Sequence, residues 1–131
     1  MINPQELRIG NWVYYKKYTK KVYSVDLLGI ELPFLSDISD VDDIRSVNSE
    51  EIDPIPLTEE WAVKFNFFEW TGWYYLTLKS LGDFFTLCYA PNEDLLMLNI
   101  GERTITYENP KVHQLQNLVF ALEGVELEMK V

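Results

Sequence analysis

The residues with the clearest capacity for chemistry lie near the C-terminus, in the stretch NPKVHQLQNLVFALEG (109–124). It contains His113, the single histidine of the chain, beside the amide side chains of Gln114, Gln116 and Asn117. A catalytic or metal-binding histidine needs a second histidine, a cysteine or a carboxylate that converges on it. The chain has no other histidine, and its single cysteine lies in a separate predicted strand. We therefore expect His113 to be a surface residue and not a catalyst.

The same stretch predicts an amphipathic helix over residues 110–123. Asn109 is a candidate N-cap, Pro110 suits the first helical position, and Gly124 suits the C-terminal stop. Apolar residues recur at three- and four-residue spacing, which predicts a core-facing side made of Val112, Leu115, Leu118, Val119 and Leu122. His113, Asn117 and Phe120 fall on the opposite side. Two interpretations stay open for that side: a solvated helix surface, or a face that contacts another protein.

A second candidate site is the aromatic stretch FFEWTGWYY (67–75), which surrounds Thr71 and Gly72. It predicts either a hairpin with cross-strand aromatic pairs, some of them in the core, or a stacking platform for a ligand, base or sugar. Platforms of this kind usually also need basic or convergent polar groups. If Trp70 or Trp73 is exposed, a binding patch becomes the better interpretation. Both residues are therefore candidate protein contacts.

Other constellations of reactive residues fail on spacing or residue type. A calcium loop that begins at Asp40 would place Ile44 and Arg45 where an oxygen ligand and a glycine are required. Cys88 has no Lys, Arg or His beside it in sequence, which favours a buried, inert thiol. Phosphate-binding glycine loops, the nucleophile-elbow serine pattern and paired metal-ligand histidines are absent. We expect no catalytic residues, no cofactor and no metal site, and therefore no enzyme.

Composition limits the class of protein. The 131 residues suffice for one domain, and the net charge is −10. Residues 36–60 hold nine of the 21 acidic side chains and one basic side chain. Direct binding to nucleic acid is therefore not expected, because phosphate contacts require clustered Lys and Arg. With no apolar run long enough to span a membrane, no signal peptide and one cysteine, we expect a cytoplasmic protein.

The segments that are expected to form strands and helices, and so to position these residues, indicate an α+β protein. Short β-rich segments at 11–17, 20–28, 29–34, 43–47 and 54–57, with Tyr18 and Thr19 as the first connection, are similar to a small SH3-like β-barrel over residues 1–57. Residues 58–131 predict a helix that begins at Thr58 and ends at Asn66, an antiparallel meander, and a packed C-terminal helix. The meander comprises strands at 72–80, 83–90, 94–101 and 103–108, and a last strand is expected at 125–130. We expect the two parts to form one compact unit.

Three stretches together carry a resemblance to known proteins: LRIGNWV (7–13), IDPIPLTEEWAVKFNF (52–67) and KVHQLQNLVFALEGVELEM (111–129). In this order they resemble an uncharacterised family of small proteins encoded by gut bacteria and their prophages or mobile elements. The resemblance implies an intracellular, phage-associated protein. It implies no activity, cofactor or catalytic residue.

The leading functional hypothesis is a non-enzymatic protein-interaction module of prophage origin. It would use either its acidic surface or the face formed by His113, Asn117 and Phe120. One alternative is an acidic decoy that inhibits a nucleic-acid-binding protein. Another is a small-ligand-binding protein or enzyme with a pocket between barrel and meander. The partner protein and the oligomeric state stay open.

Overall fold

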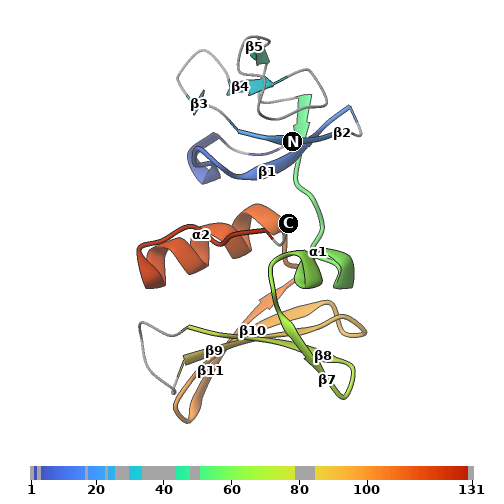
Figure 1. Cartoon of the computed structure of the whole chain (residues 1–131), viewed down its shortest axis with the longest axis vertical. Helices are drawn as coiled ribbons and strands as arrows, with labels where there is room; N and C mark the ends of the chain where they lie inside the picture. Colours follow the sequence, from blue (N-terminus) through green and yellow to red (C-terminus); the bar gives the residue numbers. More distant parts are fainter. Residues whose placement is uncertain are drawn as a thin grey trace. The chain divides into compact units, whose positions relative to one another are not determined.

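The structure is a computed structural model, and it describes residues 2, 4–16, 18–22, 24–25, 30–33, 44–47, 51–78 and 85–129. The chain divides into two compact units. The first unit combines Met1–Ile55 with Val112–Asn117, and the second combines Pro56–Lys111 with Leu118–Val131. Antiparallel sheets and helices occur along the chain (Figure 1), so the predicted α+β class is confirmed.

The described strands of the first unit form two antiparallel sheets. A short 3-10 helix, η1 (Pro4–Glu6), comes first, and one sheet then has the order β2-β1-β6, with β1 at Trp12–Tyr15, β2 at Tyr18–Lys21 and β6 at Ile52–Asp53. The other has the order β3-β4-β5, with β3 at Ser24–Val25, β4 at Ile30–Pro33 and β5 at Ile44–Val47. Strand β2 contacts β4, but no hydrogen-bonded pair of described strands joins the sheets into a closed barrel. The SH3-like barrel therefore stays a prediction.

The first hairpin turns two residues earlier than the sequence indicated. Tyr15 pairs with Tyr18, and Tyr14 pairs with Thr19, so Tyr18 and Thr19 lie in β2 and do not form the connection. The turn instead begins at Lys16, whose φ is +49°. Aromatic and β-branched side chains favour strand pairing, and this preference outweighs the adverse left-handed conformation of the lysine.

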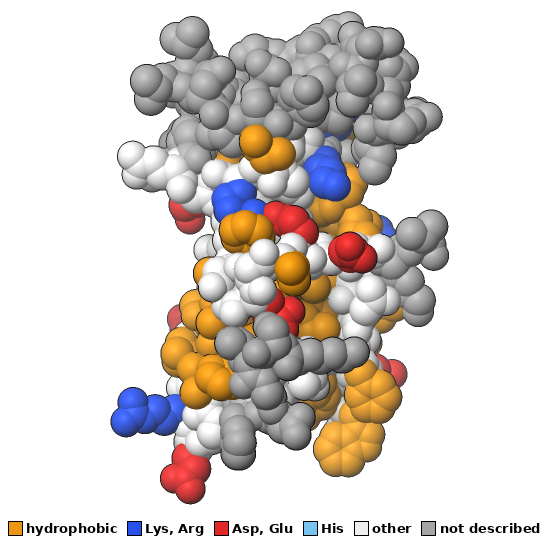
Figure 2. Space-filling view, turned by 60° about the vertical axis from the view of Figure 1, so that its left-hand side comes forward, with side chains coloured by type: hydrophobic (Ala, Val, Ile, Leu, Met, Phe, Trp, Pro, Cys, Tyr) orange, Lys and Arg blue, Asp and Glu red, His pale blue; other side chains and the backbone are white. Residues whose placement is uncertain are grey.

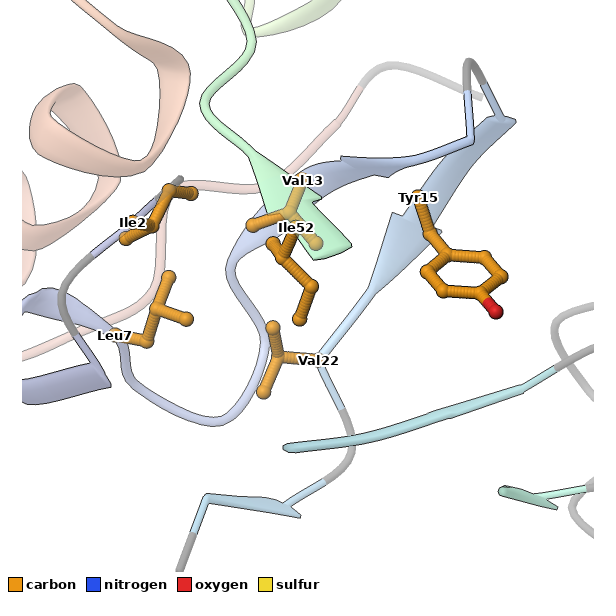
Figure 3. Close-up of a cluster of buried hydrophobic side chains, with 6 residues drawn as sticks. All are labelled: Ile2, Leu7, Val13, Tyr15, Val22 and Ile52. Carbon is orange, nitrogen blue, oxygen red and sulfur yellow. The ribbon is translucent and has the colours of Figure 1, made fainter. Parts of the chain in front are cut away.

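The core of the first unit is built by the two-residue period of β1. Val13 and Tyr15 are buried, whereas Trp12 and Tyr14 between them are only half-buried. Figure 3 shows the buried pair beside side chains that come from the N-terminal segment, the end of the hairpin and β6: Ile2, Leu7, Val22 and Ile52. Burial of each large aliphatic side chain contributes roughly 1.5–3 kcal/mol.

The second unit begins with the short helix α1 (Glu59–Lys64). Thr58 caps it as predicted, because its Oγ1 accepts a hydrogen bond from the Trp61 N–H at 3.4 Å. Trp61 and Phe65 lie one turn apart, and their ring centroids are 5.6 Å from each other. Asn66 follows with a φ of +67°, which ends the helix where the sequence predicted.

A five-stranded antiparallel sheet in the order β11-β10-β9-β8-β7 follows α1. Its strands are β7 (Phe68–Trp70), β8 (Trp73–Thr77), β9 (Phe85–Ala90), β10 (Leu95–Ile100) and β11 (Arg103–Glu108). The predicted meander is confirmed, and β7 is an additional edge strand. The strand predicted at 125–130 is wrong, because residues 126–129 have no regular structure. The Nδ2 of Asn66 donates to the Glu128 carbonyl of this segment at 3.5 Å.

Helix α2 (Val112–Glu123) starts later than predicted. Asn109 is not its N-cap: it has a φ of +48°, and its N–H donates to the Asp94 carbonyl at 3.0 Å. Lys111 forms an isolated antiparallel bridge with Pro56, so the chain stays extended until Val112. The predicted end is confirmed, since Gly124 has a φ of +72° and donates its N–H to the Phe120 carbonyl at 2.8 Å.

Candidate functional site

The structure places His113 in the interior, and the expectation of an outward-facing histidine is therefore wrong. Its side chain is 2% exposed, and both of its ring nitrogens are buried. The first half of α2 is covered on more than one side, because Val112, Leu115 and Gln116 are also at most 1% exposed. A periodicity argument assigns one buried face to a helix, and it fails where neighbouring segments cover the helix more widely.

Gln116 is a buried polar residue that the sequence did not single out. Its side-chain Oε1 accepts from the Trp12 N–H at 2.8 Å, and its Nε2 donates to the Gly10 carbonyl at 3.0 Å. One amide therefore pairs with two backbone groups of the segment that leads into β1. The residues lie more than a hundred positions apart in the chain, so no local sequence signal could have revealed the contact.

Asn117 belongs to the same set of hydrogen bonds. Its Oδ1 accepts from the Nε of Arg8 at 2.8 Å and from the Nδ2 of Asn11 at 2.9 Å, and its Nδ2 donates to the Glu6 carbonyl at 2.6 Å. The side-chain amide of Asn117 thus forms its hydrogen bonds with residues of its own unit. Of the predicted face, His113 is therefore buried, Asn117 is half-buried with its amide held by these bonds, and Phe120 is 39% exposed.

The candidate contact residues Trp70 and Trp73 lie in the hairpin formed by β7 and β8. Thr71 and Gly72 form its two-residue turn, with φ values of +53° and +86°, as in a type I′ turn. Trp70 pairs with Trp73 directly across the turn, and Phe68 pairs with Tyr75. The predicted hairpin with cross-strand aromatic pairs is thus confirmed.

Four of these aromatic residues share one face of the sheet. Alternation along β7 and β8 places Phe68, Trp70, Trp73 and Tyr75 on the same side, and the rings of Trp70 and Tyr75 lie 6.4 Å apart with their planes inclined by 55°. Phe68 is 67% exposed, Trp70 62% and Trp73 37%. We call these four residues the aromatic hairpin. Figure 2 shows hydrophobic side chains that project from the part of the surface formed by the five-stranded sheet.

The opposite face of the same two strands belongs to the interior. Tyr74 and Tyr89 pair across β8 and β9, both are buried, and the hydroxyl of Tyr89 donates to the Leu57 carbonyl at 2.9 Å. The side chains of Leu87, Leu96 and Leu98 on this face are also buried. In Figure 1, α1 lies on one side of this sheet. One face thus packs in the core, and the aromatic hairpin lies on the other.

Carboxylates surround this end of the sheet. Burial raises the pKa of Tyr74 above its ordinary value, and the negative charges of Glu59 and Glu69 raise it further. Burial likewise raises the pKa of Tyr89, with further contributions from Asp94 and Glu59. Glu69 lies in β7 between Phe68 and Trp70. Because Glu69 pairs with Tyr74, its side chain lies on the face of the strands opposite the four residues of the aromatic hairpin.

Cys88 and the acidic residues are the remaining candidates from the sequence. Cys88 is buried as predicted, burial raises the pKa of its thiol, and a hydrogen bond with Tyr75 lowers it by less. Among the described residues, no group of three or more His, Cys, Asp or Glu side chains is placed to hold a metal ion. The acidic stretch tested as a calcium loop lies largely outside the described residues.

The described helices include none with the length and apolar character required to cross a membrane. Comparisons of the chain with protein-family models, with curated proteins and with solved structures find no match.

Proposed function

We propose that the protein is a non-enzymatic protein-interaction module that binds its partner through the aromatic hairpin. The observation that carries the proposal is the exposure of Phe68, Trp70 and Trp73 side by side on one face of a sheet. Exposed aromatic side chains of this size are enriched at protein interfaces, where they provide most of the binding energy.

The size of the patch supports a binding role. At roughly 200 Å² for each aromatic side chain, the exposed fractions of the three residues correspond to about 330 Å² of surface. This lies within the range of about 300–600 Å² that is typical of the largest, often functional, apolar patch on a monomer. Its burial would contribute about 8 kcal/mol at 25 cal/mol per Å². Association itself costs about 4–15 kcal/mol, so this patch alone supports an interaction of moderate affinity.

The surroundings of the patch resemble the anatomy of an interface. On the same face of the sheet, further along the strands, Thr77 pairs with Thr86, and Asn99 pairs with Thr104. The Thr104 hydroxyl donates to the Asn99 Oδ1 at 2.9 Å. An apolar centre bordered by hydroxyl and amide groups is the usual composition of a protein-protein contact.

The proposal includes two finer points. We place the protein in the cytoplasm of a gut bacterium or among the products of its prophages, which the resemblance of the PIPLTEEW and VHQLQNL stretches supports. We also propose that the first unit is SH3-like, supported by its two three-stranded sheets and the contact between β2 and β4.

The test compares three forms of the full-length protein as bait in a lysate of the bacterial host. They are the wild type, a patch variant with Phe68→Ser and Trp70→Ser, and a control variant with Val63→Ser and Ile105→Ser. The control removes exposed hydrophobic side chains, each 45% exposed, from other elements of the same unit. We expect one or more proteins, identified by mass spectrometry, to bind the wild type and the control and not the patch variant. Equal retention by all three baits, as an acidic decoy would give, refutes the proposal, and so does the absence of any retained protein.

A further inference from the structure

The five-stranded sheet ends in β11, an edge strand that is open to solvent. It is six residues long, whereas β7 at the opposite edge has three. Five of its six side chains are exposed, and no described strand pairs with its outer side. Lysine and proline commonly protect such an edge from pairing with another chain, and the sequence RTITYE contains neither. The edge is therefore available to a further strand.

Three residues of β11 turn their backbone N–H and C=O groups away from the rest of the sheet. The N–H of Asn109 donates to the Asp94 carbonyl at 3.0 Å, and this pair continues the register of β10 and β11. In an antiparallel pair, residues that bond to the neighbouring strand alternate with residues that do not. The odd-numbered residues of β11 therefore bond to β10. The backbone groups of Thr104, Thr106 and Glu108 point to the free edge.

The side chains at this edge leave apolar surface uncovered. Ile105 pairs with Leu98, which is buried on the core face of the sheet. Tyr107 pairs with Leu96, which is buried on the same face. At the edge, however, Ile105 is 45% exposed and Tyr107 is half-buried, because no described strand lies beyond them. A strand added beside β11 would cover both side chains.

The sequence of β11 is complementary to itself in one antiparallel register. In this register Thr106 lies opposite Thr106 of a second copy, and Ile105 lies opposite Tyr107, which gives two aromatic–β-branched pairs. Thr104 lies opposite Glu108, so a hydroxyl faces a carboxylate. Such pairs stabilise neighbouring strands, and the outward N–H and C=O groups of the even-numbered residues meet one another. No two like charges lie opposite each other, which favours association of a chain with a net charge of −10.

We propose that β11 pairs antiparallel with β11 of a second copy of the chain, about a two-fold axis at Thr106. The two five-stranded sheets then form one continuous sheet. The occupant is a second copy because a two-fold axis presents the same strand to itself, and this strand supplies the complement of each of its own edge residues. This contact goes beyond the proposed function and is separate from it, since β11 and β7 lie at opposite edges of the sheet.

Sedimentation velocity of the full-length protein tests the proposal. A small interface gives a weak dimer, so the protein is studied from about 10 to 500 µM. We expect the weight-average sedimentation coefficient of the wild type to rise over this range. Hydrogen exchange at the amides of Thr104, Thr106 and Glu108 should slow in parallel, because these amides gain bonding partners.

Variants at Thr106 test the register. Thr106→Lys places two ammonium groups opposite each other at the axis, and Thr106→Glu places two carboxylates there. Each change should raise the dissociation constant of the dimer about tenfold. An equimolar mixture of the two variants should form a mixed dimer at least as tight as that of the wild type. Thr77→Lys and Thr77→Glu make the same charge changes at an exposed residue of β8 and should dimerise like the wild type.

The outcomes separate this proposal from the proposed function. A wild type that stays monomeric overturns it, and so do Thr106 variants that dimerise like the wild type or a mixture of them that stays monomeric. A dimer that Phe68→Ser with Trp70→Ser abolishes would place the contact at the aromatic hairpin and would also overturn it. The control bait of the lysate experiment carries Ile105→Ser, which should weaken this dimer and leave the hairpin intact, so each proposal can fail without the other.

Discussion

The amide of Gln116 permits the sharpest test of the structure, because one side chain pairs with two backbone groups. Gln116→Met preserves the approximate length and shape of the side chain but removes both hydrogen bonds. The Trp12 N–H and the Gly10 carbonyl then lose their partners. The segment has few ways to compensate, since the Gly10 N–H already donates to the Val22 carbonyl and the Val22 N–H donates to the Asn11 carbonyl, each at 2.8 Å.

The expected cost follows from these contacts. A buried donor or acceptor left without a partner costs about 1–3 kcal/mol, and the variant leaves two. Both bonds are partly buried, so water offsets some of the penalty, and we expect a loss of about 3 kcal/mol in the free energy of unfolding. This is a large part of the roughly 5–15 kcal/mol that is typical of a domain. Gln116→Glu keeps an acceptor for the Trp12 N–H but buries a carboxylate against the Gly10 carbonyl, so it should lose at least as much.

Urea denaturation at pH 7, followed by far-UV circular dichroism, measures the loss, and hydrogen exchange locates it. If the free energy of the opening motion that exposes the Trp12 amide falls by about 3 kcal/mol, this amide should exchange about 100-fold faster. Gln114→Met changes an exposed residue of the same helix and is the matched control, which we expect to stay within about 0.5 kcal/mol of the wild type. A Gln116→Met variant that unfolds like the control, with an equally protected Trp12 amide, would refute the reasoning.

Three further predictions concern other positions. Thr71→Asn should raise the free energy of unfolding by about 1 kcal/mol, because a β-branched residue at φ +53° gives way to the preferred Asn-Gly turn; an unchanged urea midpoint would contradict this. His113→Ala should lower the free energy of unfolding by about 2 kcal/mol, because the buried surface of the imidazole is lost. A loss below about 0.5 kcal/mol would indicate an exposed side chain. Burial raises the pKa of Cys88 above its ordinary value of 9.0, so the unfolded thiol ionises first and stability falls as pH rises past 9. Cys88→Ala should make this fall less steep in urea titrations between pH 7 and 10.5, and an identical slope would contradict the assignment.

Much of the fold was predictable where the signal is local. Thr58 caps α1 through its own side chain, and Gly124 ends α2 because it adopts a positive φ without steric cost. The aromatic hairpin was predictable for the same reason, since aromatic runs on both sides of Thr71 and Gly72 favour a tight turn between paired strands. The start of α2 was not predictable, because the bridge between Lys111 and Pro56 holds the chain extended past Asn109.

The candidate site shows the same division. The sequence identified Trp70 and Trp73 as candidates and made their exposure the deciding question, but alternation cannot show which face of a two-sided sheet is covered. The structure answers it, since Tyr74 lies in the core and Trp70 and Trp73 do not. Phe120 was assigned to an exposed helix side and is exposed, whereas His113 was assigned to that same side and is buried.

By itself, the sequence determined the α+β class, most strand positions and the ends of both helices, because each depends on residues within a few positions of one another. Only the tertiary structure decided the role of the VHQLQNL stretch. Its amides bond with Arg8, Gly10, Asn11 and Trp12, about a hundred residues away. Hydrogen bonds over such a separation leave no periodic trace in a chain. The lone histidine is thus a buried residue, and among the described residues the neighbouring exposed aromatic side chains are those of the aromatic hairpin.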